Sequence, residues 1–138
     1  MKKLLWVTLL FGIVFSSCSS LPQSQRSDDA VMKPEKNEEG EWELIVIDSD
    51  FDYFLNAIAK PESMYSEATL EQRNTMLVSE WNSYYYSGRY RKVIESAIQY
   101  DTNENYGKAF NYKLYQVFAY VGWKYGLRMR GLSAADAR

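Results

Sequence analysis

Histidine is absent from this chain of 138 residues, and cysteine occurs once, at Cys18. Without histidine, the protein lacks the usual general base near neutral pH, the commonest metal ligand and any triad built on that residue. With a single cysteine, no disulfide can form within the chain, so a folded domain depends on a packed core. No nucleophile or phosphate-loop motif is found either. We therefore predict a protein that is not an enzyme, with no metal site and no cofactor.

Basic residues are too few for a nucleic-acid-binding protein. The formal net charge is −2, and loss of Lys2 and Lys3 with a leader peptide changes it to about −4. An acidic chain of this kind is not attracted to phosphate backbones. Aromatic residues, in contrast, are plentiful, with 12 tyrosines among them, so material for a hydrophobic core is available.

The N-terminus has the parts of a secretory signal. Lys2 and Lys3 precede the uncharged apolar run from Leu4 to Phe15, and two serines then lead to Cys18. A run of this length spans only about 18 Å as a helix and is too short to cross a bilayer of about 30 Å. We therefore expect a cleaved signal and not a membrane-spanning anchor.

Small residues followed by cysteine after such a run resemble the lipobox of bacterial lipoproteins, although Phe15 stands where leucine is most common. The resemblance implies that Cys18 becomes the N-terminus and carries lipid, palmitate included. An ordinary signal cleaved elsewhere is the alternative, but it leaves one unpaired thiol in an oxidising compartment. Ser19 directly follows the cysteine, and serine at this position resembles the default signal that sorts bacterial lipoproteins to the outer membrane. We expect a lipid-anchored protein of the bacterial outer membrane, on its periplasmic face.

Composition divides the chain into four parts. Residues 1–17 form the predicted signal peptide, and residues 18–40 form a lipidated tether that is rich in polar residues and is expected to be disordered. Residues 41–128 carry the apolar pattern of a small folded domain. Residues 129–138 are expected to be a frayed C-terminal tail.

Apolar spacing within the domain predicts an α+β fold of two short strands packed with three helices, in the order β-α-α-β-α. Strands are expected at Leu44 to Ile47 and around Ile94 to Tyr100. Ser49 is expected to cap a first helix that Pro61 stops, and Ser66 a second helix that Gly88 closes. A third helix is expected from Tyr106 to Leu127. The predicted helix core positions are Phe51, Phe54, Leu55 and Ile58, then Leu70, Leu77, Trp81 and Tyr84, then Phe110, Leu114, Val117, Val121 and Tyr125.

Four segments of the domain, WELIVID with FDYFL, EWN, QYD and YGKAFNYKLYQVF, resemble a family of small Bacteroidota lipoproteins defined only as a domain of unknown function. The resemblance covers roughly residues 42–125 and leaves the C-terminal GLRMRGLSAADAR outside. It implies the same location in the cell envelope and brings no activity and no catalytic residues.

Two clusters of polar residues are candidates for metal sites. Asp48, Asp50 and Asp52 have the D-x-D-x-D spacing of a calcium loop, but the required glycine and glutamate are replaced by Tyr53 and Ala59. We interpret these aspartates as groups that cap the N-terminus of a helix. The turn DTNEN, which begins at Asp101, likewise fits a polar turn better than a calcium loop.

The run SYYYSGRY is the best candidate for a binding surface. Three consecutive tyrosines span most of a helical turn, so at least one is expected to be exposed. Tyrosine and arginine are also enriched where proteins bind partners. We predict a non-catalytic module that binds an envelope protein or glycan through Tyr84, Tyr85, Tyr86, Arg89, Tyr90 and Arg91.

Packing of the tyrosine rings into the core is the structural alternative for that run. The functional alternative is a small carboxylate-dependent hydrolase of envelope glycans, with Asp48, Glu80 and Asp101 as its candidate acids.

Overall fold

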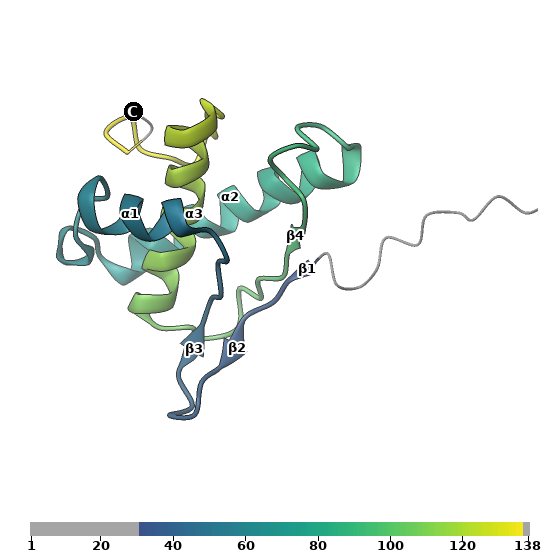
Figure 1. Cartoon of the computed structure of the whole chain (residues 1–138). Helices are drawn as coiled ribbons and strands as arrows, with labels where there is room; N and C mark the ends of the chain where they lie inside the picture. Colours follow the sequence, from purple (N-terminus) through teal and green to yellow (C-terminus); the bar gives the residue numbers. More distant parts are fainter. Residues whose placement is uncertain (1–30, 137–138) are drawn as a thin grey trace, which may run out of the picture.

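The computed structural model describes residues 31–136, which form a small α+β domain (Figure 1). Predicted signal residues 1–17 and residues 18–30 of the tether, Cys18 included, lie outside the described residues, as do residues 137–138. Within residues 31–136 the predicted fold class and the order β-α-α-β-α are confirmed, and two further short strands precede this series. The elements are β1 (Val31–Met32), β2 (Glu35–Lys36), β3 (Trp42–Glu43), α1 (Ser49–Ala57), the 3₁₀ turn η2 (Glu62–Met64), α2 (Glu67–Ser87), β4 (Ala97–Ile98) and α3 (Lys108–Tyr125).

The second helix begins and ends as predicted. The Ser66 side chain accepts a hydrogen bond from the Thr69 N–H, which satisfies one of the free donors of the first turn. At the other end Gly88 adopts φ 72°, a left-handed conformation that glycine adopts without steric cost. Leu70, Leu77 and Trp81 are buried along one side of the helix, as their spacing predicts.

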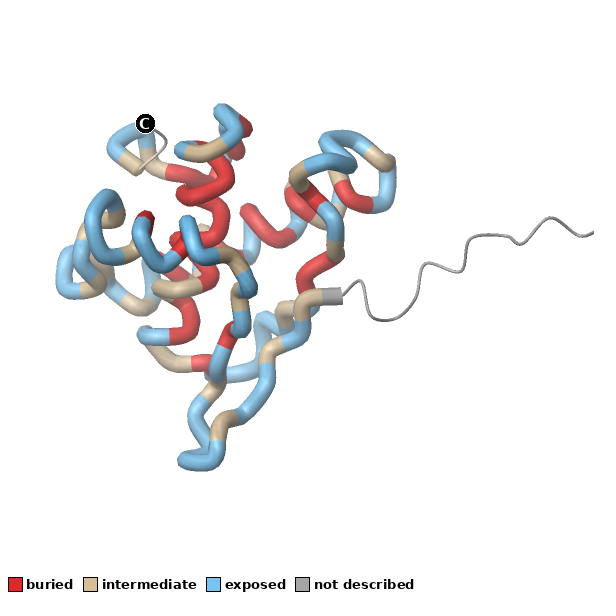
Figure 2. The backbone as a smooth tube through the Cα atoms, in the orientation of Figure 1, coloured by how far each residue is buried: buried red, intermediate tan, exposed pale blue. Residues whose placement is uncertain are grey.

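Helix α3 is the centre of the core. It is buried on several sides, because α1, α2 and the C-terminal segment all contact it, and Figure 2 shows a nearly continuous buried stretch along its axis. The predicted core residues Phe110, Leu114, Val117 and Val121 are buried. Tyr125 was also expected in the core, and this prediction is wrong, because the residue is exposed at the last turn.

Helix α1 is capped by Asp48 and not by Ser49, so the predicted capping box is wrong by one residue. The Asp48 side chain accepts a hydrogen bond from the Asp50 N–H, because the backbone of Asp48 is still extended. Phe51 and Phe54 are buried as predicted, and both rings contact Tyr120 of α3. Ile58 follows the last helical residue and is exposed.

The strands are shorter than predicted and pair in two separate sheets. β1 and β4 pair in parallel, with Val31 opposite Ala97, and β2 and β3 form an antiparallel hairpin. The apolar residues from Leu44 to Ile47 follow β3 but belong to no strand, and Ile47 is fully exposed. The Asn82 side chain accepts a hydrogen bond from the Ile98 N–H and donates one to the Ile98 C=O. These bonds take the place of a further strand beside β4.

The folded domain extends past both predicted boundaries. β1 and β2 lie within residues 31–40, which were assigned to the tether; they join the fold because β4 and β3 supply their backbone partners. The predicted frayed tail is packed as far as Asp136, since Met129 and Leu132 are buried and the Gly131 C=O accepts a hydrogen bond from Arg73. In residues 31–136, no helix has both the length and the apolar character needed to cross a membrane.

Candidate functional site

The tyrosine run lies at the C-terminal end of α2, where successive side chains point in different directions. Tyr85 is buried, Tyr84 is half-buried, and Tyr86 is exposed over 69% of its surface. Helical geometry accounts for this spread, because each residue is rotated by about 100° from the one before it. The expectation that at least one of the three is exposed is therefore confirmed, and Tyr86 is that residue.

Arg89 lies against two aromatic rings just after the helix ends. Its guanidinium carbon is 5.4 Å from the centre of the Tyr84 ring and 4.9 Å from that of Tyr90. The two rings meet edge to face, 5.1 Å apart. Tyr90 has a positive φ of 56°, an uncommon conformation for a residue with a side chain, and this turns the chain back after Gly88. We call Tyr84, Tyr85, Tyr86, Arg89, Tyr90 and Arg91 the aromatic corner.

Further contacts hold the aromatic corner in place. The Tyr84 hydroxyl donates a hydrogen bond of 2.6 Å to Glu80, and this carboxylate raises the pKa of Tyr84. The second carboxylate oxygen of Glu80 accepts a hydrogen bond from the Arg130 backbone N–H. Arg91 donates from Nε to the Gly88 C=O. The ring of Tyr84 is thus held in place by contacts within the domain.

A shallow groove of about 570 Å³ continues from the aromatic corner along the outer side of α2. Helix α2 supplies Thr75, Ser79 and Ser83, which recur every four residues and so line one face, while Arg130 and Gly131 form the opposite wall. This groove is absent from the predictions made from the sequence. The spacing of the hydroxyl residues was a visible signal, but Arg130 was placed in a frayed tail.

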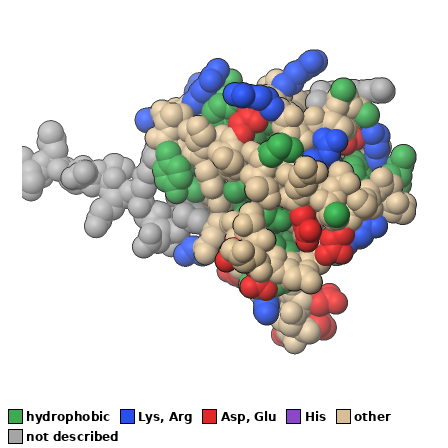
Figure 3. Space-filling model, turned by 180° about the vertical axis from the view of Figure 1, so that it is seen from behind, with side chains coloured by type: hydrophobic (Ala, Val, Ile, Leu, Met, Phe, Trp, Pro, Cys, Tyr) green, Lys and Arg blue, Asp and Glu red, His purple; other side chains and the backbone are tan. Residues whose placement is uncertain are grey.

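Charged side chains of both signs are spread over the face of the molecule that Figure 3 shows. Figure 3 shows Lys and Arg along the upper edge, which includes the end where Figure 1 places the connection from α2 to β4. Acidic side chains flank the tip of the β2–β3 hairpin at the bottom of the same view. Arg89 and Arg91 of the aromatic corner belong to the connection from α2 to β4, and both are exposed.

Asp48 at the start of α1 has an ionic partner and an aromatic one. Tyr120 donates a 2.6 Å hydrogen bond to its carboxylate, and Lys124 lies 3.1 Å away. The hydrogen bond from Tyr120, helped by Lys124, lowers the pKa of Asp48. Burial and the bond to Asp48 raise the pKa of Tyr120 to about 12. Lys124 also pairs with Asp50 at 3.1 Å, so the acidic cluster at the start of α1 faces a lysine of α3.

The three candidate acids of a hydrolase have separate surroundings. Asp48 bonds Tyr120 and Lys124, Glu80 bonds Tyr84 and Arg130, and Asp101 accepts a hydrogen bond from the backbone of Asn103 within its own turn. No partner is shared between any two of them. Across residues 31–136, no three carboxylates converge in a group that could hold a metal ion.

Comparison with known proteins identifies one family. The family of unknown function DUF6146 matches residues 4–137, whereas no curated protein and no solved structure matches. The match extends beyond the predicted range of 42–125 at both ends and includes all but the last residue of the C-terminal GLRMRGLSAADAR, which was expected to lie outside. Because it covers almost the whole sequence, the chain belongs to the DUF6146 family, an uncharacterised domain family.

Proposed function

We propose that this protein is a lipid-anchored lipoprotein of the bacterial outer membrane that acts as a non-catalytic binding module. In this proposal Cys18 carries the lipid, and the aromatic corner with the adjoining groove of α2 binds an envelope protein or glycan. The observation that carries the proposal is the position of Arg89 against the rings of both Tyr84 and Tyr90.

A cation held against two aromatic rings is well suited to binding. Tyrosine and arginine contribute large contact areas and hydrogen bonds, and they dominate the energetics of many interfaces. Because Tyr84 is already fixed by Glu80 and Arg89, little side-chain entropy is lost when a partner binds. Tyr86 adds an exposed ring, and the hydroxyls of the groove add hydrogen-bonding groups beside it.

The surroundings of the candidate acids favour binding over hydrolysis. A glycosidase needs two carboxyl groups about 5 to 9 Å apart, one of which has a raised pKa. The pKa of Asp48 is lowered instead, and both oxygens of Glu80 accept hydrogen bonds from Tyr84 and Arg130. These contacts support a structural role for both residues.

The family match supports the proposed anchor, because it begins at residue 4 and so includes the apolar segment before Cys18. Two or three acyl chains on Cys18 would hold the protein on a bilayer almost permanently, since each buried CH₂ contributes about 0.8 kcal/mol. We expect the mature N-terminal peptide to begin at a lipid-modified Cys18 by mass spectrometry. Cys18→Ser is expected to remain unlipidated and to leave the membrane fraction. An unmodified Cys18, or cleavage at another bond, would contradict the anchor.

We expect Tyr86→Ala and Arg89→Ala to abolish capture of the envelope partner while leaving the melting temperature nearly unchanged. The two side chains are exposed, so their loss removes contact area without opening a cavity. The measurement is recovery of the partner from the native envelope with the tethered protein as bait. Tyr53→Ala is the matched control, because Tyr53 is another largely exposed tyrosine and lies on α1. Equal recovery by all three variants would remove the aromatic corner from the proposal.

The same proteins test the hydrolase alternative. Purified protein is expected to release no sugar from envelope glycans. Turnover that disappears in a folded Glu80→Gln or Asp101→Asn variant would show that the protein is an enzyme.

A further inference from the structure

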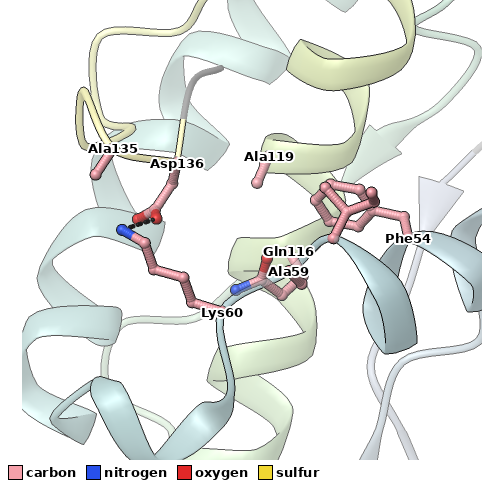
Figure 4. Close-up of a pocket in the computed structure, with 8 residues that line it drawn as sticks. Phe54, Ala59, Lys60, Gln116, Ala119, Ala135 and Asp136 are labelled. Carbon is pink, nitrogen blue, oxygen red and sulfur yellow. Dashed lines mark ion pairs between the residues drawn. The ribbon is translucent and has the colours of Figure 1, made fainter.

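A small cleft lies between the C-terminal end of α1, the middle of α3 and the last described residues of the chain (Figure 4). Its volume is about 240 Å³, and it is more enclosed than the groove on α2. Phe54, Ala59 and Ala119 give it apolar walls, whereas Lys60, Gln116 and Asp136 supply polar groups. It shares no residue with the aromatic corner or with that groove.

Gln116 carries a hydrogen-bond donor that the protein does not use. The residue is 1% exposed, and its Nε2 atom has no hydrogen-bond partner. Burial raises the pKa of Tyr65, and the Gln116 side chain opposes this rise. A buried, unpaired amide costs free energy, so its position on the wall of a cleft calls for an explanation.

An ion pair is fixed at the other side of the same cleft. Lys60 Nζ lies 2.8 Å from Asp136, and the hydroxyls of Tyr115 and Ser133 also donate to that carboxylate. Burial alone would raise the pKa of Asp136, but the bonds from Lys60, Ser133 and Tyr115 outweigh it and lower that pKa. Asp136 is therefore a carboxylate near neutral pH, and its ion pair with Lys60 leaves the cleft without net charge.

We propose that this cleft binds the acetamido group of an N-acetylated sugar. The ligand's amide carbonyl accepts the free hydrogen bond of Gln116 Nε2, and its methyl group packs against Ala59 and Ala119. The ring hydroxyls reach the pair of Lys60 and Asp136, because a hydroxyl can accept from an ammonium and donate to a carboxylate at the same time. The volume suits one monosaccharide.

Charge and hydrogen-bonding capacity favour a sugar over other occupants. A cleft without net charge offers no advantage to a free carboxylate or amine, since Lys60 and Asp136 already neutralise each other. Peptides present amide carbonyls too, but they lack the ring hydroxyls that match an ammonium and a carboxylate held side by side. The proposal does not depend on the aromatic corner, so either can fail alone.

The test is a titration of the full chain in detergent micelles, followed by ¹H–¹⁵N spectra. The Gln116 side-chain amide signals are assigned by their absence from Gln116→Met. N-acetylglucosamine is expected to shift these signals and to saturate at millimolar concentration, whereas glucose, which has a hydroxyl in place of the acetamido group, is expected to leave them in place. Equal shifts with glucose, or no saturable shift with N-acetylglucosamine, would overturn the proposal.

Two further measurements separate this role from a structural one. Gln116→Met keeps the length of the side chain but removes the donor, so binding of N-acetylglucosamine, followed at the signals of the other cleft residues, is expected to weaken about fivefold or more. The melting temperature is expected to stay the same or rise, because an unpaired buried amide is removed. Unchanged binding by this variant would overturn the role of Gln116. Preferential binding of N-acetylalanine methylamide would assign the cleft to a peptide and overturn the sugar proposal.

Discussion

Replacement of Trp81 by alanine is expected to lower the free energy of unfolding by about 3 to 5 kcal/mol, a large share of the stability of a small domain. Trp81 is 4% exposed, and its indole meets the Phe118 ring edge to face at 5.7 Å. Its Nε1 also donates a 2.7 Å hydrogen bond to the Ser96 C=O. The substitution therefore opens a cavity between α2 and α3 and leaves a carbonyl oxygen without its partner.

Urea denaturation of the variant, followed by circular dichroism, measures this loss. Trp81→Phe keeps a ring in the core but removes the N–H, so a smaller loss of about 1 to 2 kcal/mol is expected. Trp123→Ala serves as the control, because Trp123 is 38% exposed and is expected to tolerate truncation better. A urea midpoint equal to that of the wild type for Trp81→Ala would contradict the burial of Trp81. The residue would then be assigned to the binding surface.

The burial of Trp81 could be predicted because the information is local. Residues spaced as Leu70, Leu77 and Trp81 fall on one face of any helix, whatever the rest of the chain does. The same holds for the ends of α2, since Ser66 and Gly88 act on backbone groups within one turn of themselves. The helices and the fold class therefore follow from the sequence with few corrections.

The strands could not be predicted in this way, because their partners are distant in the sequence. β1 pairs with β4 across most of the domain, and a strand of two residues is too short to produce an alternating pattern. The residues from Leu44 to Ile47 show the opposite error. They have strand-like composition, but they leave the hairpin at β3 and find no backbone partner in a sheet.

The candidate sites depend on the C-terminal segment, whose polar composition concealed its packing. Arg130 forms a wall of the groove on α2, and Asp136 completes the cleft of Gln116. Arg130 is held by a hydrogen bond to Glu80, and Asp136 by an ion pair with Lys60. Both contacts join residues that are distant in the sequence. The tyrosine run, in contrast, had a local signal, namely that a helix cannot bury three consecutive side chains.

Buried amides are the remaining feature that the sequence concealed. Asn74 and Asn111 are both 0% exposed, although asparagine on a helix is usually a surface residue. Asn74 Nδ2 donates to the backbone C=O and to Oδ1 of Asn111, and the Tyr100 hydroxyl donates to the same Oδ1. The two asparagines thus join α2 to α3 through a polar contact inside an apolar core.

Asn111→Leu is expected to destabilise the protein by about 2 to 4 kcal/mol, because it replaces the Oδ1 that accepts from both Asn74 and Tyr100 by hydrocarbon. Asn74→Leu is expected to cost less. Asn74 Oδ1 is already buried without a partner, so removing this amide also removes an unfavourable group. Urea denaturation of the two single variants measures the difference.

The double variant tests whether the two residues act as a unit. Replacing both partners of a buried hydrogen bond leaves fewer unpaired groups than replacing one, so Asn74→Leu/Asn111→Leu is expected to be more stable than the sum of the single losses by about 1 to 2 kcal/mol. Tyr100→Phe, which removes only the other donor to Asn111, is the control for the contribution of that hydroxyl. Additive losses in the cycle would show that the asparagines stabilise the fold separately, and a larger loss for Asn74→Leu than for Asn111→Leu would contradict the assigned roles.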